Sequence, residues 1–124
     1  MLLFYAEFSS IKLSDNEYWF PSEILDGNTR EVINGNNKVI NSNREDVTEE
    51  FVLGAKKAVL VAKSNKVTHA ILKSKSPSCG VKEIYDGSFS KTKVNGQGIT
   101  AMMLDDEDIG LIDSDDLMSL LGGD

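Results

Sequence analysis

The alternation of hydrophobic and polar residues predicts a long helix in the middle of the chain. In 46–63, "DVTEEFVLGAKKAVLVAK", apolar residues recur at helical spacing and form one stripe that we expect to pack on a sheet. The stripe consists of Phe51, Ala55, Ala58, Val59 and Ala62. Asp46 and Glu49 have the spacing of a capping box, so we expect the helix to begin there.

The segments after this helix predict a buried strand, a loop and a second strand. Residues 67–73, "VTHAILK", are short, β-rich and apolar on both faces, as is typical of a buried parallel strand. A loop rich in serine and glycine follows over 74–98. We then expect a short helix over 98–104 and a short strand over 109–113.

Residues with turn or capping preferences predict two more elements. The stretch "REVINGNNKVI" is typical of a β-hairpin with strands at 30–33 and 38–40 and an Asn-Gly turn at 34–35. Near the end of the chain we expect a last helix, capped by Asp113 and ended by Gly122.

This order of elements favours the α/β class. Helix, strand, loop, helix, strand and helix follow one another, which is typical of right-handed βαβ units with a mostly parallel sheet. In such folds the ligand site lies just beyond the carboxyl ends of the strands. The loop residues 76–80, "SPSCG", follow the predicted strand 67–73, so we expect them at that place.

The composition is that of an ordinary globular domain. The 124 residues suffice for one domain with a single core, which we expect to span 1–124. No apolar run approaches the roughly 20 residues of a membrane span, and the first residues lack the pattern of a signal peptide. A single cysteine excludes an internal disulfide and favours a cytoplasmic protein.

Charge is distributed unevenly along the chain. The net charge of −7 argues against general nucleic-acid binding. Within 56–93, however, nine lysines accompany only two acidic residues, a local charge of +7, while the rest of the chain carries −14. This segment is either a solvated lysine-rich surface or a field that attracts an anionic ligand such as a nucleotide phosphate.

Cys79 is the residue with the most distinctive chemistry. Lys75 and Lys82 flank it, and nearby positive charge favours the thiolate, which acts as a nucleophile or a metal ligand. We expect this loop thiol to pack little. The only histidine, His69, stands at the far end of the preceding strand, so we expect no Cys–His pair. The N-terminus of the predicted helix 98–104 is a second place for an anion.

Four stretches of the chain carry the motifs of a known family. They are "DVTEEFVLGAKKAVLVAK", "AILKSKSPSCG", "IYDGSFSKTKVNGQGITAMML" and "IGLID". Together with "PSEIL" at 21–25, which is similar to the family's "PPAEI", they closely resemble the DUF523 family over 21–113. That family includes the thiouracil desulfidases.

The resemblance implies a Rossmann-like, three-layer α/β fold that holds a [4Fe–4S] cluster by three cysteines. It identifies Cys79 as one cluster ligand, and it places Ser76 and Ser78 in the substrate pocket. The open iron of such a cluster takes sulfur from a thiolated pyrimidine, and water replaces that sulfur without net redox change. In an enzyme of this kind, Cys79 and Ser78 would be the catalytic residues.

The chain departs from the family at the other two cysteines. Family members begin with a strand that ends in "CLLG", which has no counterpart here, so we expect an N-terminally truncated or divergent member. The family's "CPE" motif corresponds to "YAE" at 5–7, where Glu7 keeps the acidic position. Because Cys79 alone is a poor ligand set for a cluster, we expect no cofactor.

We therefore expect a small-ligand binding protein that keeps the pocket of the family and has lost its cluster. The ligand would be a nucleobase, a nucleotide or a nucleotide-derived signal. The alternatives are an active [4Fe–4S]-dependent desulfidase of thiolated pyrimidines, or an interaction module that pairs with a partner or with a second copy as a homodimer. The expected ligand-binding residues are Glu7, Lys75, Ser76, Ser78, Cys79, Gly80, Lys82, Tyr85 and Asp86.

Overall fold

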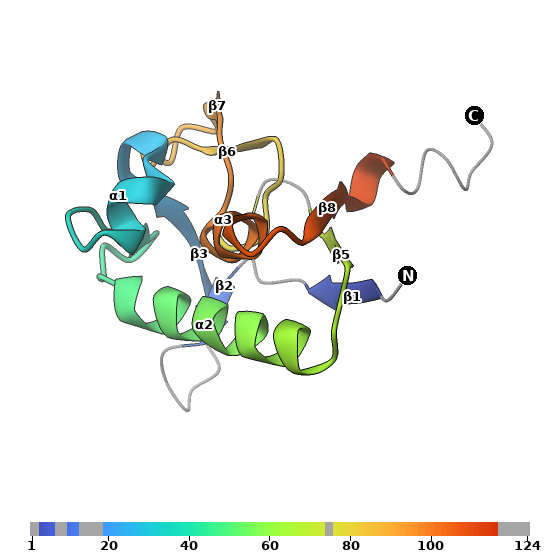
Figure 1. Ribbon diagram of the computed structural model, residues 1–124. Coiled ribbons are helices and arrows are strands. Elements are labelled where there is room, and N and C mark those ends of the chain that lie inside the picture. The colour runs from blue at the N-terminus through green and yellow to red at the C-terminus, as the bar shows by residue number, and fades with distance from the viewer. Residues whose placement is uncertain (1–2, 7–9, 13–18, 74–75, 117–124) are drawn as a thin grey trace.

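Figure 1 shows the protein as a computed structural model, which describes residues 3–6, 10–12, 19–73 and 76–116. The strands are β1 (Leu3–Ala6), β2 (Ser10–Lys12), β3 (Trp19–Ile24), β4 (Val39–Asn41), β5 (His69–Leu72), β6 (Glu83–Tyr85), β7 (Lys93–Asn95) and β8 (Gly110–Asp113). The helices are the 3-10 turn η1 (Leu25–Gly27), α1 (Thr29–Ile33), α2 (Thr48–Ser64) and α3 (Ile99–Asp106).

A parallel sheet with the order β1-β5-β8 forms one end of the molecule. Its register sets Ala6 opposite Leu72 and Leu72 opposite Asp113, so the carboxyl ends of all three strands meet at one edge. The strands predicted over 67–73 and 109–113 are thereby confirmed as β5 and β8. The apolar start of the chain provides the third strand, β1.

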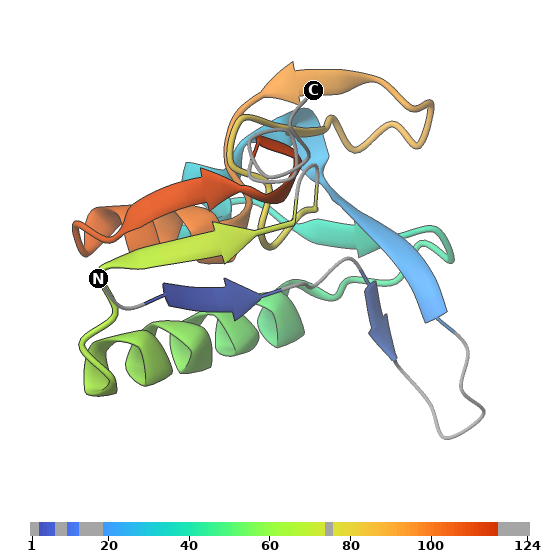
Figure 2. The ribbon, with the colours of Figure 1, turned by 90° about the vertical axis from the view of Figure 1, so that its right-hand side faces the viewer.

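Helices α2 and α3 contact each other and cover one face of this sheet (Figures 1 and 2). The predicted apolar stripe of α2 is confirmed, since all five of its residues are buried. The predicted helix over 98–104 is confirmed as α3. The α/β class is therefore correct, and the described residues form two layers there. The third layer of a Rossmann-like arrangement stays a prediction.

The hairpin predicted near residues 30–40 is wrong, because its first half is helix α1. The Asn28 side chain caps this helix by accepting a hydrogen bond from Glu31 N at 3.4 Å. The helix buries Val32, and Gly35 follows it with φ +88°, the left-handed conformation that often ends a helix. The second half, β4, is a strand that pairs with β3 in the antiparallel sheet β2-β3-β4.

The predicted capping box at the start of α2 is also wrong. The cap position is Val47, whose side chain makes no capping hydrogen bond. Asp46 instead accepts hydrogen bonds from Thr48, at 3.0 Å from the backbone N and 2.5 Å from Oγ1. These two bonds hold the pKa of Asp46 below its usual value.

The predicted loop 74–98 contains a short hairpin that the sequence did not reveal. Strands β6 and β7 pair antiparallel, with Ile84 opposite Val94. In their connection Asp86 Oδ1 accepts a hydrogen bond from Ser88 N at 2.9 Å, an Asx-type turn. Glu23 of β3 anchors this turn, because its Oε1 accepts from Gly87 N at 3.0 Å and from Phe89 N at 3.2 Å.

The predicted last helix begins where expected. Residues 114–116 are helical, and Asp113 Oδ1 accepts a hydrogen bond from Asp115 N at 2.8 Å, as a capping side chain does. Its predicted end at Gly122 lies outside the described residues. Within the described part of the chain, no helix is long and apolar enough to cross a membrane.

Two groups of buried side chains form the core, and residues of α2 and α3 belong to both. The first comprises Val59, Ala62, Ala70, Leu72, Cys79, Ala101, Leu104 and Ile109. The second comprises Ile24, Val32, Val39, Val47, Phe51, Ala55, Ile84 and Ile99. Met103 packs against both groups. The parallel sheet and the antiparallel sheet are thus joined through the two helices.

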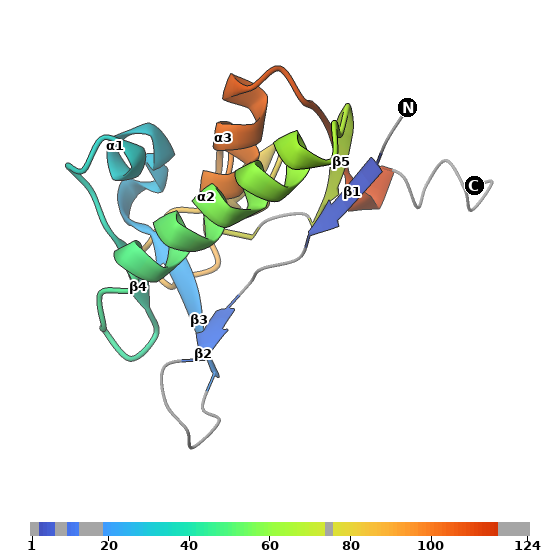
Figure 3. The ribbon, with the colours of Figure 1, turned by 60° about the horizontal axis from the view of Figure 1, so that its bottom comes forward.

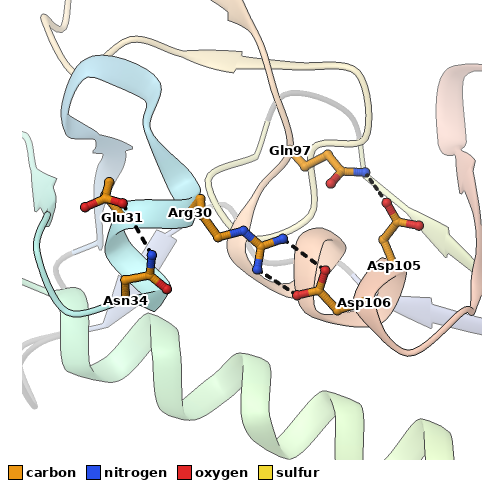
Figure 4. A network of polar contacts seen from close by, with 6 residues as sticks. All are labelled: Arg30, Glu31, Asn34, Gln97, Asp105 and Asp106. Atoms are coloured by element: carbon orange, nitrogen blue, oxygen red, sulfur yellow. Dashed lines mark hydrogen bonds and ion pairs between the residues drawn. The ribbon is translucent and has the colours of Figure 1, made fainter.

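An ion pair on the surface links α1 to α3 (Figure 4). Arg30 donates two hydrogen bonds to Asp106, at 2.8 Å from Nη1 to Oδ2 and at 2.9 Å from Nη2 to Oδ1. Gln97 and Asp105 form a weaker contact beside it, at 3.3 Å. The two-pronged geometry fixes the orientation of the short helix α1.

The Arg30–Asp106 pair predicts a small stabilisation that depends on pH. The guanidinium lowers the pKa of Asp106 from 3.8, so the pair stabilises the fold above that value and loses its effect as the pH falls through the folded-state pKa. Both side chains are 48% exposed. We therefore expect Asp106→Asn to lower the free energy of unfolding by at most about 1 kcal/mol at neutral pH, and by less in high salt.

Urea melts at neutral and acidic pH measure this difference, with Asp108→Asn as the control on the same exposed turn. An Asp106→Asn effect that is equally large at acidic pH would contradict the assignment to the ion pair.

Candidate functional site

The loop Ser76–Gly80 lies beyond the carboxyl end of β5, at the edge where the three parallel strands end. All five of its residues are buried. Ser76 Oγ accepts hydrogen bonds from Ser78 N and Cys79 N, both at 3.0 Å. Gly80 N donates to Ser76 O at 2.9 Å and closes the turn. The loop is therefore a compact, internally bonded unit.

The backbone of this loop caps helix α3. Ile99 N donates to Pro77 O at 2.8 Å, and Ala101 N donates to Ser78 O at 3.1 Å. These two N–H groups belong to the first turn of α3, where an anion would bind. The anion site predicted at this helix end is therefore wrong, since protein carbonyl oxygens occupy its place.

The loop and α3 also meet through a close backbone contact and a pair of buried hydroxyl groups. Gly98 N donates to Gly80 O at 2.8 Å. A Cβ at Gly98 would lie 2.5 Å from Ser78 O and 2.7 Å from Cys79 N, so only glycine fits. Ser78 Oγ and Thr100 Oγ1 lie 2.6 Å apart, and both residues are buried. The roles of Gly98 and Thr100 in this contact were not predicted. The available signal in the sequence was the hydroxyl of Thr100 within an apolar helical run.

Cys79 is a core residue, which corrects the expectation of a loosely packed loop thiol. It has no exposed surface and packs in the same group as Leu72, Ala101 and Leu104. The reason is tertiary, because α3 and β5 enclose the loop from both sides. A buried thiol of this kind behaves as a small hydrophobic side chain.

The expected positive field around the loop is reduced by acidic neighbours. Lys82 Nζ lies 2.5 Å from Asp116 Oδ2, and this hydrogen bond raises the pKa of Lys82. Asp113 and Asp115 add to the same effect. Lys75 lies outside the described residues. The cation predicted beside Cys79 at Lys82 is therefore already paired within the chain.

The other predicted site residues are divided between the hairpin and the start of the chain. Tyr85 and Asp86 belong to the β6–β7 hairpin, where the hydrogen bond from Ser88 lowers the pKa of Asp86. This hairpin packs on the loop, since a Cβ at Gly80 would lie 2.8 Å from Ile84. Glu7 lies outside the described residues, one position after Ala6.

Comparison with known proteins gives three matches. The family model described as 2-thiouracil desulfurase matches residues 21–116. The uncharacterized protein YbbK of Bacillus subtilis (strain 168) is 40% identical over 101 residues, which are 82% of this chain and 67% of that protein. The solved structure of the [4Fe-4S]-dependent thiouracil desulfidase TudS has 34% sequence identity and a TM-score of 0.63. That match covers 69% of this chain and 57% of the solved chain, so the chain spans less than two thirds of TudS.

The residues present do not fit a [4Fe–4S] cluster like the one named for TudS. Such clusters are held by several cysteine thiolates, and the sequence has one cysteine. That thiol is enclosed among apolar side chains. Within 3–6, 10–12, 19–73 and 76–116, no group of three histidine, cysteine or acidic residues is placed to hold a metal ion.

Burial of Cys79 predicts that its replacement affects folding. We expect Cys79→Ser to lower the free energy of unfolding by about 1 to 3 kcal/mol, because it brings a hydroxyl into an apolar group. Cys79→Ala adds no polar group and should cost less. Denaturant melts measure both changes. If Cys79→Ser were as stable as the unchanged protein, and the native thiol reacted rapidly with an alkylating reagent, the buried placement would be wrong.

The close contact at Gly98 predicts that a single added methyl group destabilises the fold more than Cys79→Ala does. Gly98→Ala should lower the free energy of unfolding by more than about 2 kcal/mol, because the methyl group overlaps the backbone of Ser78. Gly96→Ala is the matched control, since the nearest atoms to its new methyl group lie at 3.7 Å. Equal melting behaviour of the two variants would contradict the described contact between the loop and α3.

Proposed function

This chain belongs to the 2-thiouracil desulfurase family, and from that premise we propose that it binds a small nucleobase-like ligand without cluster chemistry. The site would lie at the carboxyl edge of the parallel sheet. The ligand would be a nucleobase, a nucleotide or a nucleotide-derived signal. The register that aligns Ala6, Leu72 and Asp113 carries this proposal, because it assembles the edge where α/β folds bind ligands.

The rigidity of the loop supports binding at this edge. Ser76–Gly80 is held by its own hydrogen bonds and by α3, so the edge has a fixed wall before any ligand arrives. A preorganised wall reduces the ordering cost of binding. Glu7 comes directly after the last residue of β1 in the sequence, and we propose that it supplies an acceptor for the N–H groups of a pyrimidine.

The charges near the loop favour the nucleobase part of such a ligand. Lys82 is paired with Asp116, and Asp113 and Asp115 lie close to it. A phosphate at this place would compete with three carboxylates for one ammonium group. A neutral ring with hydrogen-bonding edges meets no such competition, so we propose that the ring occupies the edge and any phosphate points away from it.

A second candidate function is hydrolytic desulfuration. The related TudS is named a [4Fe-4S]-dependent thiouracil desulfidase. In that reaction water supplies the oxygen that replaces the ring sulfur, which leaves as hydrogen sulfide, and no electron is gained or lost. The single cysteine of this chain argues against this function, because further thiolates would have to come from elsewhere.

Binding predicts saturable titrations with uracil and 2-thiouracil, measured by calorimetry or by chemical-shift changes in the protein. We expect Glu7→Gln to weaken binding about tenfold or more, since a charge-assisted hydrogen bond to the ring is lost. Glu49→Gln is the matched control, because it removes a carboxylate from the exposed first turn of α2. Absence of saturable binding to uracil, 2-thiouracil and uridine monophosphate would reject the proposal.

Anaerobic reconstitution with iron and sulfide separates the two functions. Ligand binding by a colourless, iron-free protein supports the binding function. Broad visible absorption with bound iron, together with release of sulfide from 2-thiouracil, would instead establish the desulfidase.

A further inference from the structure

The outer face of helix α2 carries exposed apolar side chains. Leu53 and Val61 are each 50% exposed and Leu60 is 65% exposed. These three and Phe89 are the exposed large hydrophobic residues of the described chain. They lie on the opposite side of the helix from the buried stripe, and Figure 3 shows α2 with no other helix or strand of the described chain across its outer side.

Gly54 borders this face, and no packing contact within the described chain requires glycine there. A Cβ at this position would meet no atom within 4 Å. Glycine weakens a helix interior relative to alanine, so its use here needs an explanation outside the packing of the chain itself. Without a side chain at this position, the backbone of another helix can approach closely beside Leu53.

The charges along the same face are arranged in opposite halves of the helix. Glu49 and Glu50 lie in the first turn, whereas Lys56 and Lys57 lie further along the helix. Glu50 and Lys57 form no ion pair within the described part of the chain. Seven residues of helix separate them by about 10.5 Å, so they cannot reach each other. In an antiparallel pair of these helices, Glu50 of each copy would lie opposite Lys57 of the other copy.

We propose that the outer face of α2 is the interface of a symmetric homodimer, in which two α2 helices pack antiparallel. With the two-fold axis near Leu53 and Gly54, Leu53 of one copy packs against Leu53 of the other, and the two Gly54 residues let the helix backbones approach closely. Glu50 of each copy then lies beside Lys57 of the second copy. This Glu50–Lys57 contact occurs twice, as a two-fold interface requires. This proposal goes beyond ligand binding and does not depend on it.

A hollow beside the N-terminal half of α2 fits this arrangement. It measures about 440 Å³, and its lining combines the apolar Ile33 and Val52 with the carboxylates of Asp46, Glu49 and Glu50. Antiparallel packing sets the C-terminal half of the second helix, with Leu60 and Val61, opposite this end. The apolar part of the lining thus faces Leu60 and Val61 of the other copy, and Glu50 faces Lys57.

Sedimentation velocity over a wide concentration range tests the dimer. We expect twice the chain mass at high concentration, and dissociation on dilution. Glu50→Lys and Lys57→Glu should each raise the dimer dissociation constant about tenfold or more, because like charges then face each other. The double variant Glu50→Lys/Lys57→Glu should restore the dimer, since both symmetric ion pairs form again with reversed signs.

The variant Gly54→Ala tests whether the outer face of α2 is an interface or an ordinary exposed surface. In the monomer the added methyl group meets open space, so the thermal midpoint at low concentration should rise. In the dimer the same group lies between the two helix backbones and keeps them apart, so the dissociation constant should rise about tenfold or more. Phe89→Lys, which removes the exposed hydrophobic residue outside α2, is the control and should leave the mass unchanged.

A single-chain mass at every concentration would overturn the proposal. So would a dimer whose dissociation constant is unchanged by Gly54→Ala and by both charge variants, since that dimer would use another surface.

Discussion

The contact between the loop Ser76–Gly80 and the first turn of α3 is the constraint on which the rest of the structure depends. Three backbone hydrogen bonds join the two segments, from Gly98, Ile99 and Ala101 to carbonyl oxygens of the loop. They satisfy N–H groups that a helix leaves free at its start, and they do so without an ion or water. Because α3 also packs on α2, the same bonds tie the carboxyl edge of the parallel sheet to the core.

The spacing of apolar residues was sufficient to predict the elements in which buried and exposed residues follow a regular pattern. Helix α2 and strand β5 were predictable because their apolar spacing reflects one buried face or a buried strand. The error at 30–40 has a different cause. Asn-Gly suits both a hairpin turn and a helix end, and here Gly35 follows α1 in the left-handed conformation. The hairpin β6–β7 escaped prediction because its short strands are mostly polar and partly exposed.

The position of the candidate site was predictable from the sequence, but its burial and its charge were not. A loop after a parallel strand lies at the carboxyl edge whatever its sequence. The burial of Cys79 and the pairing of Lys82 with Asp116 arise from segments that are distant in the chain. Local sequence carries no information on such neighbours. The count of lysines around the loop therefore overstated the positive charge that a ligand would meet.

The same contact changes what the family motif can say about function. Ser76, Ser78 and Gly80 already have structural tasks, since their polar atoms or close contacts hold the loop against α3 and the hairpin. A chain that lost its chemistry would still need them to fold. Evidence for a ligand must therefore come from groups other than these. Evidence for an interface must come in the same way from residues such as Gly54, where the fold has room for a side chain and does not require glycine.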